Sequence, residues 1–258
     1  MAKDTHALGS IVLERGGYVA RFAVTSDNLE RCQRLRHRCF IEHAGGAARS
    51  NGLETDEFDS RSDHVLIENS VGDIVCSFRT IFAASGADLA DSYTAQFYGL
   101  ERLAEYTQPV LELGRFCISS DVQDPDVLRI AWGMIAKIVD ARAIGFLFGC
   151  SSFMGMDAAP YRDAFALLSA NHQAPASWAP TVKSKDVVPL DSLGGITTRK
   201  TAMEQLPPLL RTYLSMGGWV SNHAVVDPQM NTLHVFTGLE IEAIPSARAK
   251  ALRAILNG

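Results

Sequence analysis

Two charged residues, Glu112 and Arg115, lie in the apolar stretch LELGRFCI (111–118), whose composition predicts a strand. Burying a carboxylate is costly unless the group is paired or has a chemical task. Glu112 could therefore act as a general base, directly or through a water molecule. The alternative is a structural ion pair of Glu112 with Arg115 or Arg79. The sequence leaves both interpretations open.

A second pair of carboxylates, Asp56 and Asp59, lies in the polar segment ETDEFDSRSD (54–63). On a loop, these side chains could bind the ammonium group of a substrate. They could equally hold Arg36 and Arg79 in place by ion pairing. Carboxylates on loops are commonly just solvated, which is the third interpretation.

The other reactive side chains are not arranged for catalysis. The chain has five cysteines, an odd number without CxxC spacing, which favours buried reduced thiols over a disulfide framework or a metal site. The histidines show no metal-ligand spacing. Ser151 and Ser152 lie in FGCSSF (148–153), but no GxSxG elbow surrounds them. We expect no metal and no covalent intermediate on a serine or cysteine.

Composition limits the function further. The chain has 258 residues and a formal net charge of -5, which disfavours a general nucleic-acid-binding role because phosphate backbones demand clustered Lys and Arg. The first ten residues contain no apolar signal region, and no run of about 18 apolar residues could span a bilayer. We expect a cytoplasmic location and leave peripheral contact with the inner membrane open.

The elements that must position these residues alternate between strands and helices. We expect a helix from a cap at Asp27 to about Phe40, an inserted segment over 84–108 with one short helix, and a helix opened by Pro125. The remaining expected elements are strands over 18–24, 110–118 and 144–150, helices over 157–169 and 206–216, and hairpins over 64–83 and 219–239. This mixed order predicts a three-layer α/β fold.

Two sets of short motifs resemble known families. The series RLRHRCF, ETDEFD, SFRTI and LELGRFCI resembles acyl-homoserine-lactone synthases, through Arg36, Phe40, the two aspartates, Arg79 and the Glu112–Arg115 pair. FGCSSF (148–153) and LPPLLRTYLSMGGWVSNHAVVD (206–227) resemble the ornithine lipid synthases, which are amino-acid N-acyltransferases that depend on acyl carrier protein. This resemblance covers roughly residues 20–240.

The resemblance implies a GNAT-like fold, with a mixed central sheet splayed between its fourth and fifth strands, as one domain over 18–240 followed by a basic tail over 241–258. It implies transfer of a 3-hydroxyacyl chain to the α-amine of an amino acid. Glu112 and Arg115 are the implied catalytic residues, and the implied substrate-binding residues are Arg36, Phe40, Asp56, Asp59, Arg79, Asn222 and His234. An oxyanion donor is expected from the backbone at a strand distortion near 115–119.

The segment SSDVQDPDVLR (119–129) argues against coenzyme A as donor. It has no glycine and carries three aspartates, which disfavour a pyrophosphate. A phosphopantetheine on acyl carrier protein has one phosphate and fits better, so we expect no cofactor of the enzyme's own. Carrier proteins are acidic, and Arg31, Arg34 and Arg38 share one helix face as a candidate docking patch. An ordinary solvated face is the alternative.

Two positions depart from the ornithine lipid synthases. Where that family carries acidic residues in the late hairpin, this sequence has Asn222 and His234. The loss of an acidic pair weakens the case for a cationic acceptor and raises glutamine as a close second to ornithine. The competing functions are an acyl-homoserine-lactone synthase and a non-catalytic acyl-binding or carrier-docking module.

Overall fold

The computed structural model describes residues 11–48, 50–195 and 198–254, and the chain forms two compact units. Of these described residues, the first unit contains 11–48, 50–82, 113–144 and 246–254, and the second contains 83–112, 145–195 and 198–245. The two units are described separately below.

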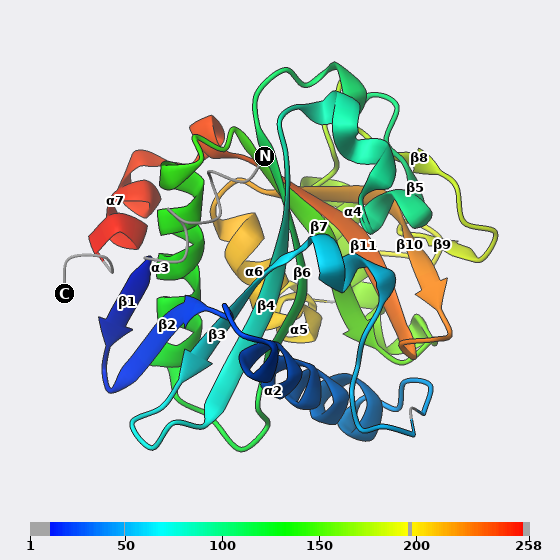
Figure 1. The fold of residues 1–258 in the computed structure, drawn as a ribbon. Helices are drawn as coiled ribbons and strands as arrows, with labels where there is room; N and C mark the ends of the chain where they lie inside the picture. Colours follow the sequence, from blue (N-terminus) through cyan, green and yellow to red (C-terminus); the bar gives the residue numbers. More distant parts are fainter. Residues whose placement is uncertain (1–10, 49, 196–197, 255–258) are drawn as a thin grey trace. The chain divides into compact units, whose positions relative to one another are not determined.

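The first unit is built on antiparallel strands covered by helices (Figure 1). Strands β1 (Val12–Arg15), β2 (Tyr18–Phe22), β3 (Asp63–Glu68) and β4 (Ile74–Ala83) are neighbours in that order, and the later part of β6 (Val110–Ile118) follows β4. Helix α2 (Ser26–His37) packs against β3, and α3 (Pro125–Ala141) packs against β1 and β2.

Local chemistry explains where these helices begin and end. Pro125 opens α3 as predicted, and the Asp124 side chain caps it by accepting a hydrogen bond from the Asp126 N–H. The cap of α2 is Thr25 rather than the predicted Asp27, because the Thr25 hydroxyl accepts from the Asn28 N–H. Beyond His37 the chain does not stop near Phe40 but continues as the π-helix η1 (Arg38–His43).

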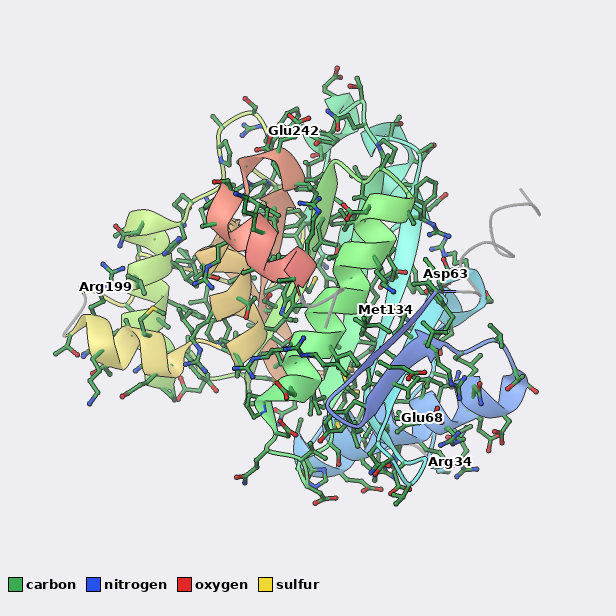
Figure 2. The ribbon with its side chains drawn as sticks, turned by 90° about the vertical axis from the view of Figure 1, so that its left-hand side faces the viewer. Arg34, Asp63, Glu68, Met134, Arg199 and Glu242 are labelled. Atoms are coloured by element: carbon green, nitrogen blue, oxygen red, sulfur yellow. The ribbon has the colours of Figure 1, made fainter. Side chains whose placement is uncertain are left out.

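The basic tail is ordered in its described part. Helix α7 (Ser246–Ala254) packs beside α3, as Figure 2 shows, and Arg253 binds Asp140 with an Nη2–Oδ1 distance of 2.8 Å. A short 3-10 turn, η7 (Ile241–Ala243), precedes it in the second unit. Arg253 is therefore engaged with the protein surface.

The second unit carries four antiparallel neighbours in the order β7 (Phe146–Met154), β11 (Thr232–Glu240), β10 (Trp219–Asp227) and β9 (Val187–Pro189). Alternation along these strands divides the core. Phe153 and Val235 pack with α4 (Arg162–Asn171), α5 (Arg199–Gln205) and α6 (Pro208–Ser215). Phe148 and Phe236 pack in an aromatic cluster with the segment that precedes β6.

That segment, predicted to hold one short helix, contains three 3-10 turns and a short strand. They are η3 (Gly86–Asp91), η4 (Thr94–Gln96), β5 (Tyr98–Gly99) and η5 (Leu103–Glu105). Strand β5 pairs with β8 (Thr181–Val182), and the turn η6 (Ala159–Tyr161) precedes α4. Turns of three to six residues show too little helical periodicity to be predicted from the sequence.

The two predicted hairpins and the strand 110–118 are confirmed. Strand β1 was not predicted. Within the described residues, no helix combines the length and apolarity needed to cross a membrane.

Candidate active site

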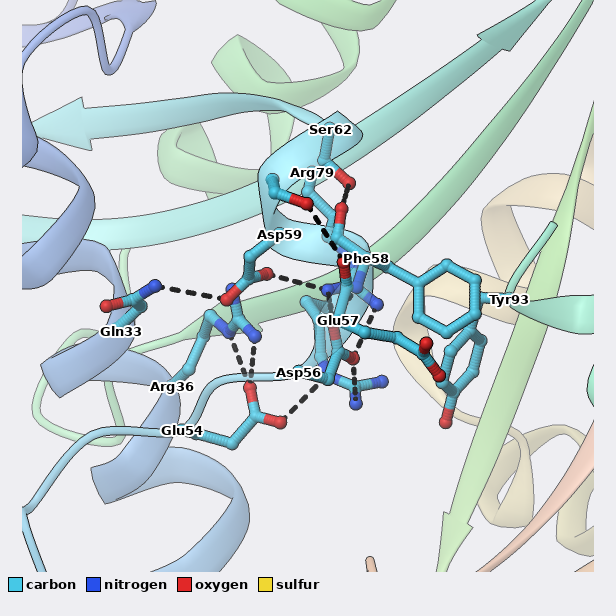
Figure 3. A network of polar contacts seen from close by, with 12 residues as sticks. Gln33, Arg36, Glu54, Asp56, Glu57, Phe58, Asp59, Ser62, Arg79 and Tyr93 are labelled. Carbon is cyan, nitrogen blue, oxygen red and sulfur yellow. Dashed lines mark hydrogen bonds and ion pairs between the residues drawn. The ribbon is translucent and has the colours of Figure 1, made fainter. Parts of the chain in front are cut away.

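Six charged side chains of the first unit, four of them buried and two half-buried, form a closed ring in which arginines and carboxylates alternate. Helix α2, strand β4 and strand β6 each supply one arginine, and the segment around the 3-10 turn η2 (Glu57–Arg61) supplies three carboxylates. We call this set the ion-pair ring: Arg36, Glu54, Asp56, Asp59, Arg79 and Arg115. Figure 3 shows most of its contacts.

One half of the ring is built around Arg36, which is fully buried. Its Nε donates to Glu54 Oε2 at 2.6 Å, and its Nη1 donates to Asp59 Oδ1 at 2.8 Å. Asp59 Oδ1 also accepts from Arg79 Nη1 at 2.7 Å. Asp59 therefore bridges two arginines that come from a helix and a strand.

The other half closes the ring through Arg115. Arg79 Nη2 donates to Asp56 Oδ2 at 2.8 Å, and Arg115 Nη2 donates to the same oxygen at 2.8 Å. Arg115 Nε then reaches Glu54 Oε1 at 3.1 Å. Every member of the ring thus contacts two members of opposite charge, so the buried charges compensate each other.

The ring favours the ionised forms of Asp56 and Asp59. Burial alone would raise the pKa of Asp56, but hydrogen bonds and charges from Arg79 and Arg115 outweigh burial and lower it. Burial likewise opposes ionisation of Asp59, and Arg36 and Arg79 together lower its pKa. The arginines outweigh the effect of burial because Asp56 and Asp59 accept hydrogen bonds from guanidinium groups at close range.

Neighbouring polar groups fix the carboxylate segment in place. Asp56 caps η2 by accepting from the Phe58 N–H at 3.0 Å, and Gln33 Nε2 donates to Asp59 Oδ2 at 3.0 Å. The Glu54 N–H donates to the Gln33 carbonyl at 3.1 Å. The His64 ring contacts the Asp59 carbonyl oxygen at 3.0 Å through Nε2. The segment that carries the three carboxylates is therefore anchored to α2 and β3.

The backbone of Arg115 is distorted within strand β6. Its φ is +52°, a left-handed conformation that is uncommon for a residue other than glycine. Such conformations persist where the surroundings over-determine them, and here Glu54 and Asp56 hold the Arg115 side chain. The distortion lies at the start of the range 115–119 in which a strand irregularity was expected.

Glu112 has a different environment, in the second unit. Its side chain is 3% exposed. It accepts hydrogen bonds from the Tyr93 N–H at 3.0 Å, from the Thr94 N–H at 2.7 Å and from the Thr94 hydroxyl. Backbone amides at the start of η4 therefore donate hydrogen bonds to this carboxylate. We call this arrangement the Glu112 cradle: Glu112, Tyr93 and Thr94.

The sequence missed Glu54, Tyr93 and Thr94. Glu54 is two residues before Asp56 in a segment already singled out, so its acidic neighbours were the available signal. Thr94 offered no signal, because it lies within an insertion that has no regular periodicity. Roles in catalysis and binding for all of these residues stay predictions.

The remaining predicted substrate residues are dispersed. Phe40 is half-buried on η1 and packs against the cluster around Cys32 and Leu35. In the second unit, His234 is buried and its Nδ1 lies 3.2 Å from the Tyr98 hydroxyl. Asn222 is exposed, with its Oδ1 2.7 Å from His223 Nδ1. Asn222 and His234 thus have different surroundings, and their pairing on an acceptor stays a prediction.

The predicted docking patch is only partly available. Arg31 is engaged by Glu68 at 3.0 Å and by the Gly72 carbonyl at 2.5 Å. Arg34 is exposed on the outer side of α2, where it pairs with Glu30 (Figure 2). Arg38 is also exposed. The patch that a partner could reach is therefore centred on Arg34 and Arg38.

Known proteins place the chain in a family. The model described as acetyltransferase (GNAT) domain matches residues 35–133. An L-ornithine N(alpha)-acyltransferase of Rhodobacter capsulatus is 31% identical over 240 residues, covering 88% of this chain and 91% of the relative. This chain belongs to the L-ornithine N(alpha)-acyltransferase family. The Brucella abortus member of the family is 28% identical, and that match covers 92% of this chain and 89% of the relative.

Membership of the family makes the chain an N-acyltransferase and confirms the predicted family and enzyme class. The structure of FeeM, an N-acyl amino acid synthase from uncultured soil microbes, has a TM-score of 0.50 and is 12% identical, covering 87% of this chain and 91% of that one. At this identity the likeness shows the fold alone. The predicted GNAT-like α/β fold is confirmed, and the splay between its fourth and fifth strands stays a prediction.

Proposed function

We propose that this N-acyltransferase moves a 3-hydroxyacyl chain from acyl carrier protein to the α-amino group of ornithine. The observation that carries the proposal is the 31% identity, across most of both chains, to a relative named for acylating ornithine at its α-amine. A lactone synthase is less well supported, because all four curated relatives at 25–31% identity carry the ornithine name.

The chemistry is an aminolysis of a thioester. The neutral α-amine attacks the thioester carbonyl, the C–N bond forms, the C–S bond breaks, and the thiol leaves on the carrier protein. The amine is mostly protonated at neutral pH, so Glu112 takes one proton, directly or through water. The three hydrogen bonds of the Glu112 cradle support this role, because they hold the buried carboxylate in one orientation.

The developing oxyanion needs a donor, and the distorted backbone at Arg115 supports one. A residue with φ of +52° interrupts the regular alternation of peptide groups along a strand, so an N–H beside it can point away from the ladder. Glu112 and Arg115 are three residues apart on β6. The ion-pair ring holds the Arg115 side chain, so its role in the reaction is to keep this backbone in place.

The charges on the surface of this chain support acyl carrier protein as the acyl donor. Arg34 and Arg38 are exposed on one side of the chain segment formed by α2 and η1, and acidic carrier proteins suit such a surface. The segment 119–129, which lacks glycine and carries three aspartates, disfavours the pyrophosphate of coenzyme A. The lipid-like product would bring the enzyme to the inner membrane face as a peripheral protein.

Glutamine is the second candidate acceptor, favoured by Asn222 and His234 at positions where acidic residues would suit an ornithine ammonium group. Asn222 is exposed, so Asn222→Asp should shift preference toward ornithine by up to about fivefold, the range of an exposed ion pair. An unchanged ratio of products would remove the hairpin from acceptor recognition.

The test is a competition between acceptors and donors. The purified protein is incubated with 3-hydroxyacyl carrier protein and an equimolar mixture of ornithine, glutamine, lysine and S-adenosylmethionine, and the products are read by mass spectrometry. Fragmentation separates acylation of the α-amine from acylation of the side-chain amine. We expect Nα-acylornithine from the carrier protein and less from the coenzyme A thioester. Lactone formation, or binding of the carrier protein without product, would overturn the proposal.

A further inference from the structure

Two cysteines of the first unit, Cys39 and Cys117, lie side by side where the π-helix η1 runs along the end of β6. Cys39 Sγ is 3.5 Å from the carbonyl oxygen of Ile118, the residue after Cys117. Cys39 also packs against the hydrophobic cluster that contains Cys117. One turn further along η1, His43 Nε2 lies 3.3 Å from the Ser120 hydroxyl. The two segments are thus in contact over several residues.

The two thiols differ in exposure and acidity. Cys39 is half-buried, whereas Cys117 is 5% exposed in the cluster with Cys32, Leu35, Leu66 and Ile74. The hydrogen bond from the Cys117 thiol lowers the pKa of Cys39 against the opposing effect of burial, and the charge of Arg38 adds to the lowering. The same hydrogen bond, together with burial, raises the pKa of Cys117. Cys39 is therefore the more readily ionised and more accessible thiol, and Cys117 is the protonated neighbour.

We propose that Cys39 and Cys117 are an oxidation site, at which a hydroperoxide converts the adjacent thiols to a disulfide that joins η1 to β6. The Cys39 thiolate attacks hydrogen peroxide, giving a sulfenic acid and, with one proton, water. The Cys117 sulfur then displaces the hydroxyl as a second water, and the S–S bond forms. Two thiols are oxidised and one peroxide is reduced, so atoms and electrons balance.

The position of the pair connects it to the ion-pair ring. Cys117 is two residues beyond Arg115 on β6, and Cys39 is three residues beyond Arg36 on the same continuous helical segment. The two sulfurs of a disulfide are about 2.05 Å apart, so bond formation draws the two segments together. Each of the two segments carries an arginine of the ion-pair ring close to its cysteine. Oxidation therefore lowers acyl transfer, a consequence that rests on the proposed function, whereas the disulfide itself does not.

The oxidation state of each cysteine can be measured separately, because each of the five lies in its own tryptic peptide. The peptides of the pair are residues 39–49 and 116–129, and Cys150 lies in 143–162. The full chain is treated with hydrogen peroxide, digested without reduction and examined by mass spectrometry. We expect the cross-linked pair 39–49 and 116–129, lighter by two hydrogen atoms than the sum of the peptides and released by dithiothreitol.

Three variants make the test decisive. Cys39→Ser should abolish the cross-link, and Cys117→Ala should leave a sulfenic acid at Cys39 that a dimedone reagent traps. Cys150→Ser is the matched control, because Cys150 is also half-buried but lies in the second unit. This variant should form the Cys39–Cys117 cross-link as the wild type does. Oxidation of the wild type should lower the acyl-transfer rate reversibly by at least about tenfold, since displacements near 1 Å can cost that much, and change that of Cys39→Ser by less than about twofold.

A cross-link between other peptides, or Cys39 oxidised to sulfinic acid with Cys117 unmodified, would overturn the proposal. A wild-type protein that forms the cross-link but transfers no acyl chain even when reduced would overturn the proposed function instead. The two failures are therefore distinguishable.

Discussion

The ion-pair ring and the Glu112 cradle both bury carboxylates, but they solve the problem in opposite ways. In the ring, three carboxylates are matched by three guanidinium groups, and each group contacts two partners. In the cradle, one carboxylate is held by two backbone amides and a hydroxyl. Each ring carboxylate thus accepts hydrogen bonds from charged groups, whereas the three hydrogen bonds described for Glu112 come from neutral groups. The comparison supports a structural role for the ring and the proposed role of Glu112 as the base, and both roles stay predictions.

The largest effect on stability is expected from Glu54→Gln. Glu54 bridges Arg36 and Arg115 and is fully buried, so its loss leaves two guanidinium groups short of a charge. Breaking a buried pair from one side costs about 3–5 kcal/mol of unfolding free energy. Urea unfolding measures the change.

Glu57→Gln is the matched control, since Glu57 is exposed in the same segment and its loss should change stability by less than about 0.5 kcal/mol. Equal, small effects of the two variants would contradict the structural role of the ring.

Acid should weaken the ring in a defined pH range. The pKa values of Asp56 and Asp59 are lowered from 3.8 in the folded protein, so their contribution to stability is complete above that value. It is lost as the pH falls further, through the folded-state pKa values. Urea unfolding from pH 7 to 3 should therefore show a steep loss below about pH 4.

His64 should lower the stability at a higher pH than the two aspartates do. Burial lowers the pKa of His64 from 6.5, so folding favours the neutral ring and stability begins to fall below pH 6.5. His64→Gln should make this upper decline shallower. The loss of stability below about pH 4 has its own test. If the double variant Asp56→Asn, Asp59→Asn lost stability there as steeply as the wild type, the ring would not be the source of that loss.

A smaller change is expected when the cradle loses one donor. Thr94→Val keeps the shape of the side chain but removes the hydroxyl that donates to Glu112, which should cost about 1–2 kcal/mol of stability. Thr94→Ser retains the donor and serves as the control. Thr94→Val should also shift the acidic limb of the kcat/KM profile to higher pH, because the Glu112 carboxylate loses one hydrogen-bond donor. An unmoved profile would separate Glu112 from the proton transfer.

The smallest effect concerns the docking patch. Reversing Arg34 and Arg38 to Glu should raise the KM for acyl carrier protein by about tenfold at low salt, and less at high salt, because exposed charges are screened. Arg129→Glu is the control. Like Arg34, Arg129 is more than half exposed and pairs with a carboxylate on its own helix. Equal effects of the two reversals would reject the patch as a specific surface.

The sequence predicted the parts of the fold that have a strong local pattern. Strand β6 was expected over 110–118 and lies there, because its apolar run is bounded by polar residues. The π-helix η1 was not expected, because Cys39 and Phe40 continue a helical pattern and only tertiary packing changes its pitch. The turns of 86–105 were missed because they are too short to show a period.

The candidate site was predictable only as separate residues. Five of the six ring members were singled out by their resemblance to a motif series, but the closed ring depends on contacts between residues up to 61 positions apart, such as Glu54 and Arg115. No local pattern encodes those contacts. Thr94 was invisible for the same reason, since its importance comes from an 18-residue separation from Glu112.

The most direct test of the division between ring and cradle is the single-turnover rate of acyl transfer by Glu112→Gln. A lost general base should lower this rate by about 100-fold or more while binding of the acyl carrier protein is retained. The rate is measured by mass spectrometry of the product, and circular dichroism checks that the variant is folded. Transfer at the wild-type rate by a folded Glu112→Gln protein would contradict the assignment of the chemistry to Glu112.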